Sequence, residues 1–127
     1  MQILLLMLFG ALGTLARYAL SLWIQLPLAR HGVVMPVATI VINCAGTFLL
    51  ALVVSLATAG RLSSEWRLWL GTGFCGAFTT FSTFELEAAT LLGDDRNLAA
   101  TGYVLANLFL GFTCVLLGRA VADRLLP

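Results

Sequence analysis

The fold is decided by residues 71–87, which read GTGFCGAFTTFSTFELE. Three glycines stand near its start, and a run of Thr, Ser and Phe follows them. Glycine in a helix interior costs about 1 kcal/mol relative to alanine, so this composition predicts an interrupted helix. In hydrocarbon, freed backbone groups need a partner from protein, water or an ion. We therefore expect a helix broken near the middle of a membrane. The alternative is a kinked helix whose Ser and Thr hydroxyls bond back to its own carbonyls.

The composition around this stretch is that of an integral membrane protein. The chain has 127 residues, of which 61% are hydrophobic and 10% are charged, whereas a soluble domain has about 25% charged residues. The formal net charge of +1 leaves no basic patch for nucleic acid. No nucleophile–base pair, phosphate-cradling loop or metal-ligand cluster is present, so the sequence does not indicate an enzyme.

Four apolar runs are long enough to cross a bilayer, since one helical crossing takes about 20 residues. They cover residues 3–24, 36–58, 68–92 and 98–121. We expect residues 1–127 to form a single all-α domain of four transmembrane helices, with the third helix broken mid-membrane. The three cysteines, Cys44, Cys75 and Cys114, lie singly inside apolar runs, which favours a packing role over a disulfide or zinc site.

The charges allow either orientation in the membrane. Four passes would place both termini and the second loop on one side, with Arg61, Arg67, Arg119 and Arg124. The other side would hold Arg30 and Arg96, so the positive-inside bias is weak. Either the termini face inward, or the chain inserts both ways. Dual insertion would allow an antiparallel homodimer.

Beyond the expected break, polar and aromatic residues separate into two faces of a helix. Thr80, Thr83 and Glu87 follow steps of three and four, and Phe81 and Phe84 lie on the neighbouring face. Phenylalanine ring edges are electropositive, so they can meet an anion without holding it tightly. The alternative for the pair is ordinary packing. A carboxylate such as Glu87 is costly inside a membrane unless it is paired or hydrated.

The second and fourth runs carry polar positions at helical spacing too. Asn43 lies between Thr39 and Thr47 at steps of four, and Tyr103 and Asn107 are also four residues apart. Hydrogen bonds that hold membrane helices together are the alternative for each of these. Three polar faces in one small chain indicate a lined path.

Two further features concern charged residues. Arg17, late in the first run, can extend to the membrane interface or attract anions into a vestibule. Ser82 and Glu85 have the spacing of a capping box, which predicts the start of the second half-helix there.

Residues 73–84, followed by Glu87, closely resemble the signature of the Fluc (CrcB) fluoride channels. Residues 10–18, GALGTLARY, resemble the first-helix motif of that family. The second-helix motif is matched in spacing by Pro36, Thr39, Asn43 and Gly46, and the fourth helix mainly by Tyr103 and Asn107. Ala38 and Ala77 depart from it, because they stand where the family commonly has glycine.

The resemblance implies an antiparallel, dual-topology homodimer with two fluoride pores and a structural sodium ion (Na+) at the dimer interface. Backbone carbonyls of the two helix breaks would bind the sodium, and here they map to Gly76 and Thr79. Phe81 and Phe84 map to the phenylalanines that line the pores with their ring edges.

The remaining pore positions also follow from the resemblance. Asn43 maps to the pore asparagine, Ser82 and Thr83 to a hydroxyl pair beside it, and Glu87 to a pore-proximal glutamate. Arg17 maps to an arginine near the aqueous vestibule. Together with Tyr103 and Asn107, these residues would serve passive export of cytoplasmic fluoride across the bacterial inner membrane, which reduces fluoride toxicity.

Two other functions fit the size and composition. A four-helix, dual-topology exporter of organic cations usually depends on a carboxylate in its first helix, where this chain has Arg17 and no acid. A membrane scaffold without transport activity would pass no ion and would not need the 71–87 motif.

Overall fold

The computed structural model describes residues 1–126, and all regular structure in that range is helical. The elements are α1 (Gln2–Arg30), α2 (Val37–Thr58), α3 (Ser64–Arg67), η1 (Leu68–Cys75), α4 (Gly76–Phe78), α5 (Phe81–Gly93) and α6 (Asn97–Leu125). Three of them, α1, α2 and α6, are long and apolar enough to cross a membrane. The prediction of an all-helical membrane protein is confirmed at this level.

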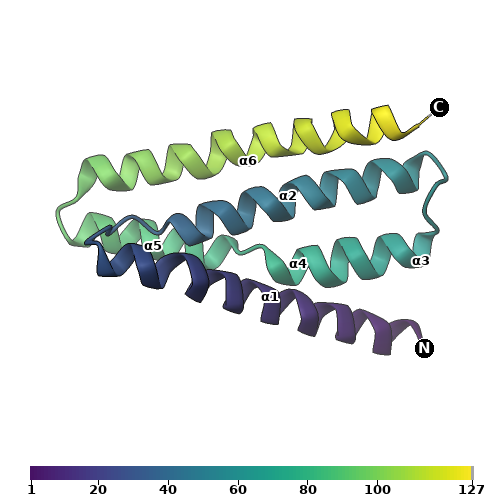
Figure 1. Ribbon diagram of the computed structural model, residues 1–127, viewed down its shortest axis with the longest axis horizontal. Helices are drawn as coiled ribbons and strands as arrows, with labels where there is room; N and C mark the ends of the chain where they lie inside the picture. The colour runs from purple at the N-terminus through teal and green to yellow at the C-terminus, as the bar shows by residue number, and fades with distance from the viewer. Residues whose placement is uncertain (127) are drawn as a thin grey trace.

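The elements lie lengthwise beside one another (Figure 1). Both termini and the α2–α3 connection are at one end of the molecule, and the α1–α2 and α5–α6 connections are at the other. Consequently α2 and α6 run in the same direction. The consecutive elements α3, η1, α4 and α5 lie between α1 and α2 over much of their length. We call the first of these ends the terminal end.

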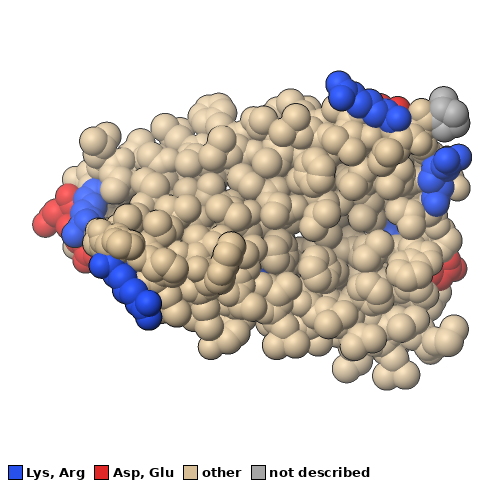
Figure 2. All heavy atoms as spheres, viewed as in Figure 1, with Lys and Arg blue, Asp and Glu red and all other residues tan. Residues whose placement is uncertain are grey.

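Charged side chains gather at the two ends of the molecule (Figure 2). Between them, the face shown is a wide band of uncharged residues. A band of this kind suits the hydrocarbon of a bilayer, where an exposed charge is costly.

The first helix is longer than the sequence indicated. The apolar run was expected to end at residue 24, but α1 continues through Pro27 to Arg30. The side chain of Gln25 holds this extension against the start of α2. Its Nε2 donates to the carbonyl of Met35 at 3.3 Å, and its Oε1 accepts from the backbone N–H of Ala38 at 3.4 Å. Gln25 therefore connects the end of α1 to the start of α2.

The third apolar run is divided into several pieces. η1 is π-helical, α4 continues it for a single turn, and Thr79 and Thr80 then adopt extended backbone before α5 begins. The Thr80 hydroxyl caps α5 by accepting the N–H of Thr83 at 3.3 Å. The predicted capping box at Ser82 and Glu85 is therefore wrong. The cap lies two positions earlier, because the extended backbone at Thr80 brings its side chain over the first turn.

Glycines bring the helices close together. A Cβ atom at Gly13 of α1 would overlap the carbonyl of Phe74, and one at Gly118 of α6 would overlap the carbonyl of Phe48. Close backbone approach through small residues is the usual way in which membrane helices associate. The largest buried cluster lies between α2, α5 and α6 and comprises Ile40, Phe84, Ala88, Leu91, Ala100 and Tyr103.

Candidate functional site

The side chain of Asn43 lies at the break between α4 and α5. Its Oδ1 accepts the backbone N–H of Thr80 at 2.9 Å, and its Nδ2 donates to the carbonyl of Thr80 at 3.2 Å. In a continuous α-helix, the N–H of Thr80 would instead donate to the carbonyl of Gly76. One side-chain amide thus satisfies both backbone groups of Thr80, which is what an interrupted helix requires in an apolar medium.

The same amide connects the break to α6. Asn43 Nδ2 donates to Asn107 Oδ1 at 3.1 Å, and Asn107 Nδ2 donates to the carbonyl of Tyr103 at 3.1 Å. Both hydrogens of the Asn43 amide are therefore used by protein acceptors, whereas Asn107 keeps one free. The Thr80 hydroxyl donates to Thr83 Oγ1 at 2.8 Å, so the hydrogen of Thr83 also remains free. Asn107 and Thr83 are the donors that this network can offer to an anion.

The carboxylate of Glu87 is paired with a tyrosine. The hydroxyl of Tyr103 donates to Glu87 Oε2 at 2.6 Å, and Tyr103 is fully buried. The distance of 2.6 Å is at the short end of the range for O–H···O hydrogen bonds. The ring of Phe84 packs on Tyr103 with 5.5 Å between the ring centroids. The pairing supplies the partner that an intramembrane carboxylate needs.

Tyr103→Phe is expected to destabilise the protein by about 1–3 kcal/mol, because it removes the hydroxyl and leaves Glu87 without this partner. Thermal unfolding in detergent measures the change. Tyr18→Phe is the matched control, since Tyr18 is 64% exposed. Equal melting temperatures for the two variants would show that the Tyr103–Glu87 hydrogen bond contributes nothing to stability.

A pocket of about 220 Å³ opens beside the break. Asn43, Thr80 and Asn107 form its polar part, and Phe81 and Phe84 line it as well. The two rings are tilted at 48° with 5.7 Å between their centroids. Phe84 is 7% exposed and part of the core, whereas Phe81 is 67% exposed. The pocket therefore combines the free amide hydrogen of Asn107 with two aromatic rings, a chemistry that suits a small anion.

The predicted site residues thus fall into two groups. The hydrogen-bond network and the pocket bring together Asn43, Thr83, Phe81, Phe84, Glu87, Tyr103 and Asn107. Arg17 is not part of this group: its Nε is buried and has no hydrogen-bond partner within residues 1–126. Ser82 is exposed on α5.

Gly76 and Thr79, the expected sodium ligands, flank the break. Thr79 follows α4 directly, and its hydroxyl donates to the carbonyl of Cys75 at 3.0 Å. Within residues 1–126 there is no cluster of His, Cys, Asp and Glu that could hold a metal ion.

Two contributors were not identified from the sequence. Leu108 lines the pocket but is one leucine among many in an apolar helix, so no signal distinguishes it. Gln25 does have a signal, because it directly follows the first apolar run and is the only amide side chain between residues 3 and 42.

Comparison with known proteins gives a consistent result. The sequence profile of a family described as "CrcB-like protein, Camphor Resistance (CrcB)" matches residues 4–119. A Pyrococcus abyssi protein named "Fluoride-specific ion channel FluC" is 42% identical over 122 residues, which cover 95% of each chain. Proteins of the same name from Gloeothece citriformis and Acidobacterium capsulatum are 37% and 42% identical over 98% and 91% of this chain, and of their own lengths.

Proposed function

The chain belongs to the CrcB family, and from this premise we propose that it is a fluoride-selective ion channel that lets fluoride leave the cytoplasm passively. It is a multi-pass membrane protein. The observation that carries the proposal is the pocket at the break, where the free amide hydrogen of Asn107 and two phenylalanine rings meet. Passage through a pore makes and breaks no covalent bond, so the protein is a channel and not an enzyme. The names of its relatives, and Arg17 in place of a first-helix acid, favour this function over export of organic cations.

The pore is proposed to need two antiparallel copies of the chain, each with a broken third span. Phe81, which lines the pocket at the break, is 67% exposed in a single chain. The aromatic side of the pocket is therefore uncovered. A second copy related by a two-fold axis through the breaks would supply that cover. The near-balance of charge between the two sides would let the copies insert in opposite directions.

A structural sodium ion is proposed at the interface of the two copies. The carbonyl of Gly76 loses its usual N–H partner, because Thr80 donates to Asn43 instead. Together with the carbonyl of Thr79, it supplies neutral, hard oxygen ligands, which suit a hard cation such as sodium. Gly76 and Thr79 of each copy would hold the ion, and its charge would fix the two breaks against each other.

Each pore residue is given a role that its surroundings support. Phe81 and Phe84 would present ring edges, and Asn107 and Thr83 would donate hydrogen bonds. Asn43 would keep the backbone at Thr80 in its extended conformation by hydrogen bonding to its N–H and carbonyl. Tyr103 would fix the position of the Glu87 side chain. Ser82, which is exposed on α5, would act where the pore meets water. Arg17 would attract anions toward the pore through its charge.

Purified protein in liposomes loaded with fluoride or chloride tests the function. Fluoride is expected to leave rapidly once a potassium ionophore balances the charge, and chloride is expected to stay inside. An ion-selective electrode measures both. Equal rates for the two halides would contradict fluoride selectivity, and no efflux of either would favour a scaffold.

Phe81→Ile and Phe84→Ile are both expected to lower fluoride efflux by about tenfold or more, because isoleucine has no electropositive ring edge. Their effects on stability should differ. Phe84 is buried against Tyr103 within one chain, so its replacement should lower the melting temperature more than replacement of Phe81, which only the second copy would cover. Phe112→Ile, on an exposed position of α6, is the control. Unchanged efflux for either pocket variant would remove that ring from the pore.

A further inference from the structure

Two of the three cysteines meet where α2 contacts α6. Cys44 and Cys114 are 70 residues apart in the sequence, and both thiols are free and half-buried. In the fold they are neighbours across the contact between the two helices. The sequence predicts three single cysteines with a packing role, but the structure places two of them together.

Close approach of the two backbones explains why the thiols meet. A Cβ atom at Gly118 of α6 would overlap the carbonyl of Phe48 on α2, so the helices touch there without an intervening side chain. Cys114 precedes Gly118 by four residues, and Cys44 precedes Phe48 by four residues. Because α2 and α6 run in the same direction, the two cysteines occupy equivalent positions one turn earlier on each helix.

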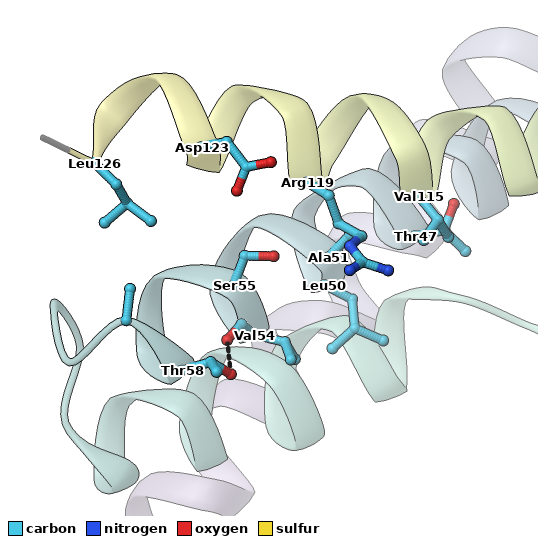
Figure 3. A pocket seen from close by; sticks show the side chains of 11 residues that line it. Thr47, Leu50, Ala51, Val54, Ser55, Thr58, Val115, Arg119, Asp123 and Leu126 are labelled. Carbon is cyan, nitrogen blue, oxygen red and sulfur yellow. Dashed lines mark hydrogen bonds between the residues drawn. The ribbon is translucent and has the colours of Figure 1, made fainter.

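Residues next to the pair confirm this register of the helices. Figure 3 shows Thr47 on α2 close to Val115 on α6, and both line the pocket between these helices. Val115 is the residue after Cys114. The Thr47 hydroxyl also lies 3.4 Å from the carbonyl of Gly111, which is one turn before Cys114. The helices are therefore in contact on both sides of the two thiols.

The surroundings of the thiols restrict which reagents can modify them. Cys44 packs against the apolar cluster that includes Ile40 and Tyr103. A thiol in apolar surroundings stays protonated, and it reacts slowly with reagents that need a thiolate. A trivalent arsenical has no such need, because the thiol proton leaves together with an oxygen of the arsenical. Such a reagent is also uncharged, so it can reach the thiols through the lipid.

We propose that Cys44 and Cys114 form a dithiol site that binds trivalent arsenic through one As–S bond from each helix. With phenylarsine oxide, the two S–H bonds and the As–O bonding break, and two As–S bonds form. The oxygen leaves with both protons as water, and arsenic is neither oxidised nor reduced. Sulfur is the ligand that soft, thiophilic elements prefer. The site does not depend on the proposed channel function.

Binding in the presence of a competing monothiol tests the site. Fully reduced protein in detergent is mixed with phenylarsine oxide and an excess of 2-mercaptoethanol, and native mass spectrometry measures the adduct. The wild type is expected to keep one phenylarsenic group per chain, which 2,3-dimercaptopropanol should remove. Cys44→Ser and Cys114→Ser should each bind at least about 100-fold more weakly, because the second bond of a chelate forms within one molecule.

Cys75→Ser is the matched control. Cys75 lies on η1, outside the contact between α2 and α6, so this variant should bind as the wild type does. Equal retention of the adduct by Cys44→Ser or Cys114→Ser would overturn the dithiol site. Loss of the adduct in Cys75→Ser, or a wild type that keeps none, would overturn it as well.

Thermal unfolding shows whether the thiols meet in the folded protein. Bound arsenic closes a loop between residues 44 and 114 in the unfolded chain, as a disulfide would. The melting temperature of the wild type and of Cys75→Ser should therefore rise by about 5 °C or more. Neither Cys44→Ser nor Cys114→Ser should show a rise. An adduct that leaves the melting temperature of the wild type unchanged would overturn the proposal, because the thiols would then meet only after unfolding.

Discussion

Fluoride efflux is expected to fall about a hundredfold when Asn43 is replaced by aspartate, the change that alters fewest atoms at the break. Aspartate can still accept the N–H of Thr80, as Asn43 Oδ1 does at 2.9 Å. Its second oxygen, however, would face the carbonyl of Thr80 and the Oδ1 of Asn107, where Nδ2 now donates at 3.2 and 3.1 Å. Two hydrogen bonds would become two contacts between oxygens. A negative charge would also stand beside the path of an anion. A hundredfold loss corresponds to roughly 2.7 kcal/mol, which is within reach of two lost hydrogen bonds.

Asn97→Asp provides the control for this substitution. It makes the same chemical change at the exposed first residue of α6, where an acid is compatible with the helix dipole. It should leave both efflux and melting temperature close to wild type. If Asn43→Asp conducts as well as Asn97→Asp does, the amide of Asn43 is not what holds the break in its conducting form.

Periodicity in the sequence indicated which helix faces carry the polar side chains near the break. Steps of four put Asn43 on one face of α2 and Asn107 on one face of α6, and in the fold these two side chains lie within hydrogen-bond distance. The glycines of residues 71–87 indicated a break, and extended backbone is found at Thr79 and Thr80. These features are local, and a helix translates spacing into direction reliably.

What the sequence did not show depends on contacts between segments. Asn43 pairs with both backbone groups of Thr80 because of the way α2 packs against the break. The cap of α5 was predicted at Ser82 because Ser82 and Glu85 have the spacing of a capping box, whereas the extended backbone places it at Thr80. Likewise, Gln25 looked like the end of an apolar run, while in the fold it connects α1 to α2.

Gly46→Ala is expected to lower both stability and fluoride efflux, because the added methyl would strike the break itself. A Cβ atom at Gly46 would overlap the Cγ2 methyl of Thr79 and would lie 3.1 Å from Cδ1 of Phe78. Because Gly46 is one turn from Asn43 on α2, pushing α2 away from Thr79 would also pull Asn43 from Thr80. We expect a loss of about 2–3 kcal/mol in unfolding free energy from overpacking, together with a loss of most fluoride efflux. Chemical denaturation in detergent and the liposome assay measure the two effects.

Gly102→Ala is the control, and its effect on stability should have the opposite sign. Nothing lies within 4 Å of a Cβ atom at Gly102, so alanine there should only favour the helix, by about 1 kcal/mol. The contact with Thr79 can be tested directly by adding Thr79→Ser to Gly46→Ala. Serine keeps the hydroxyl that donates to the Cys75 carbonyl and removes the methyl that alanine would strike. The double variant should therefore recover much of the stability and efflux, a coupling that independent sites do not show. If the losses of the two single variants simply add in the double variant, Gly46 is needed for a reason other than its contact with Thr79.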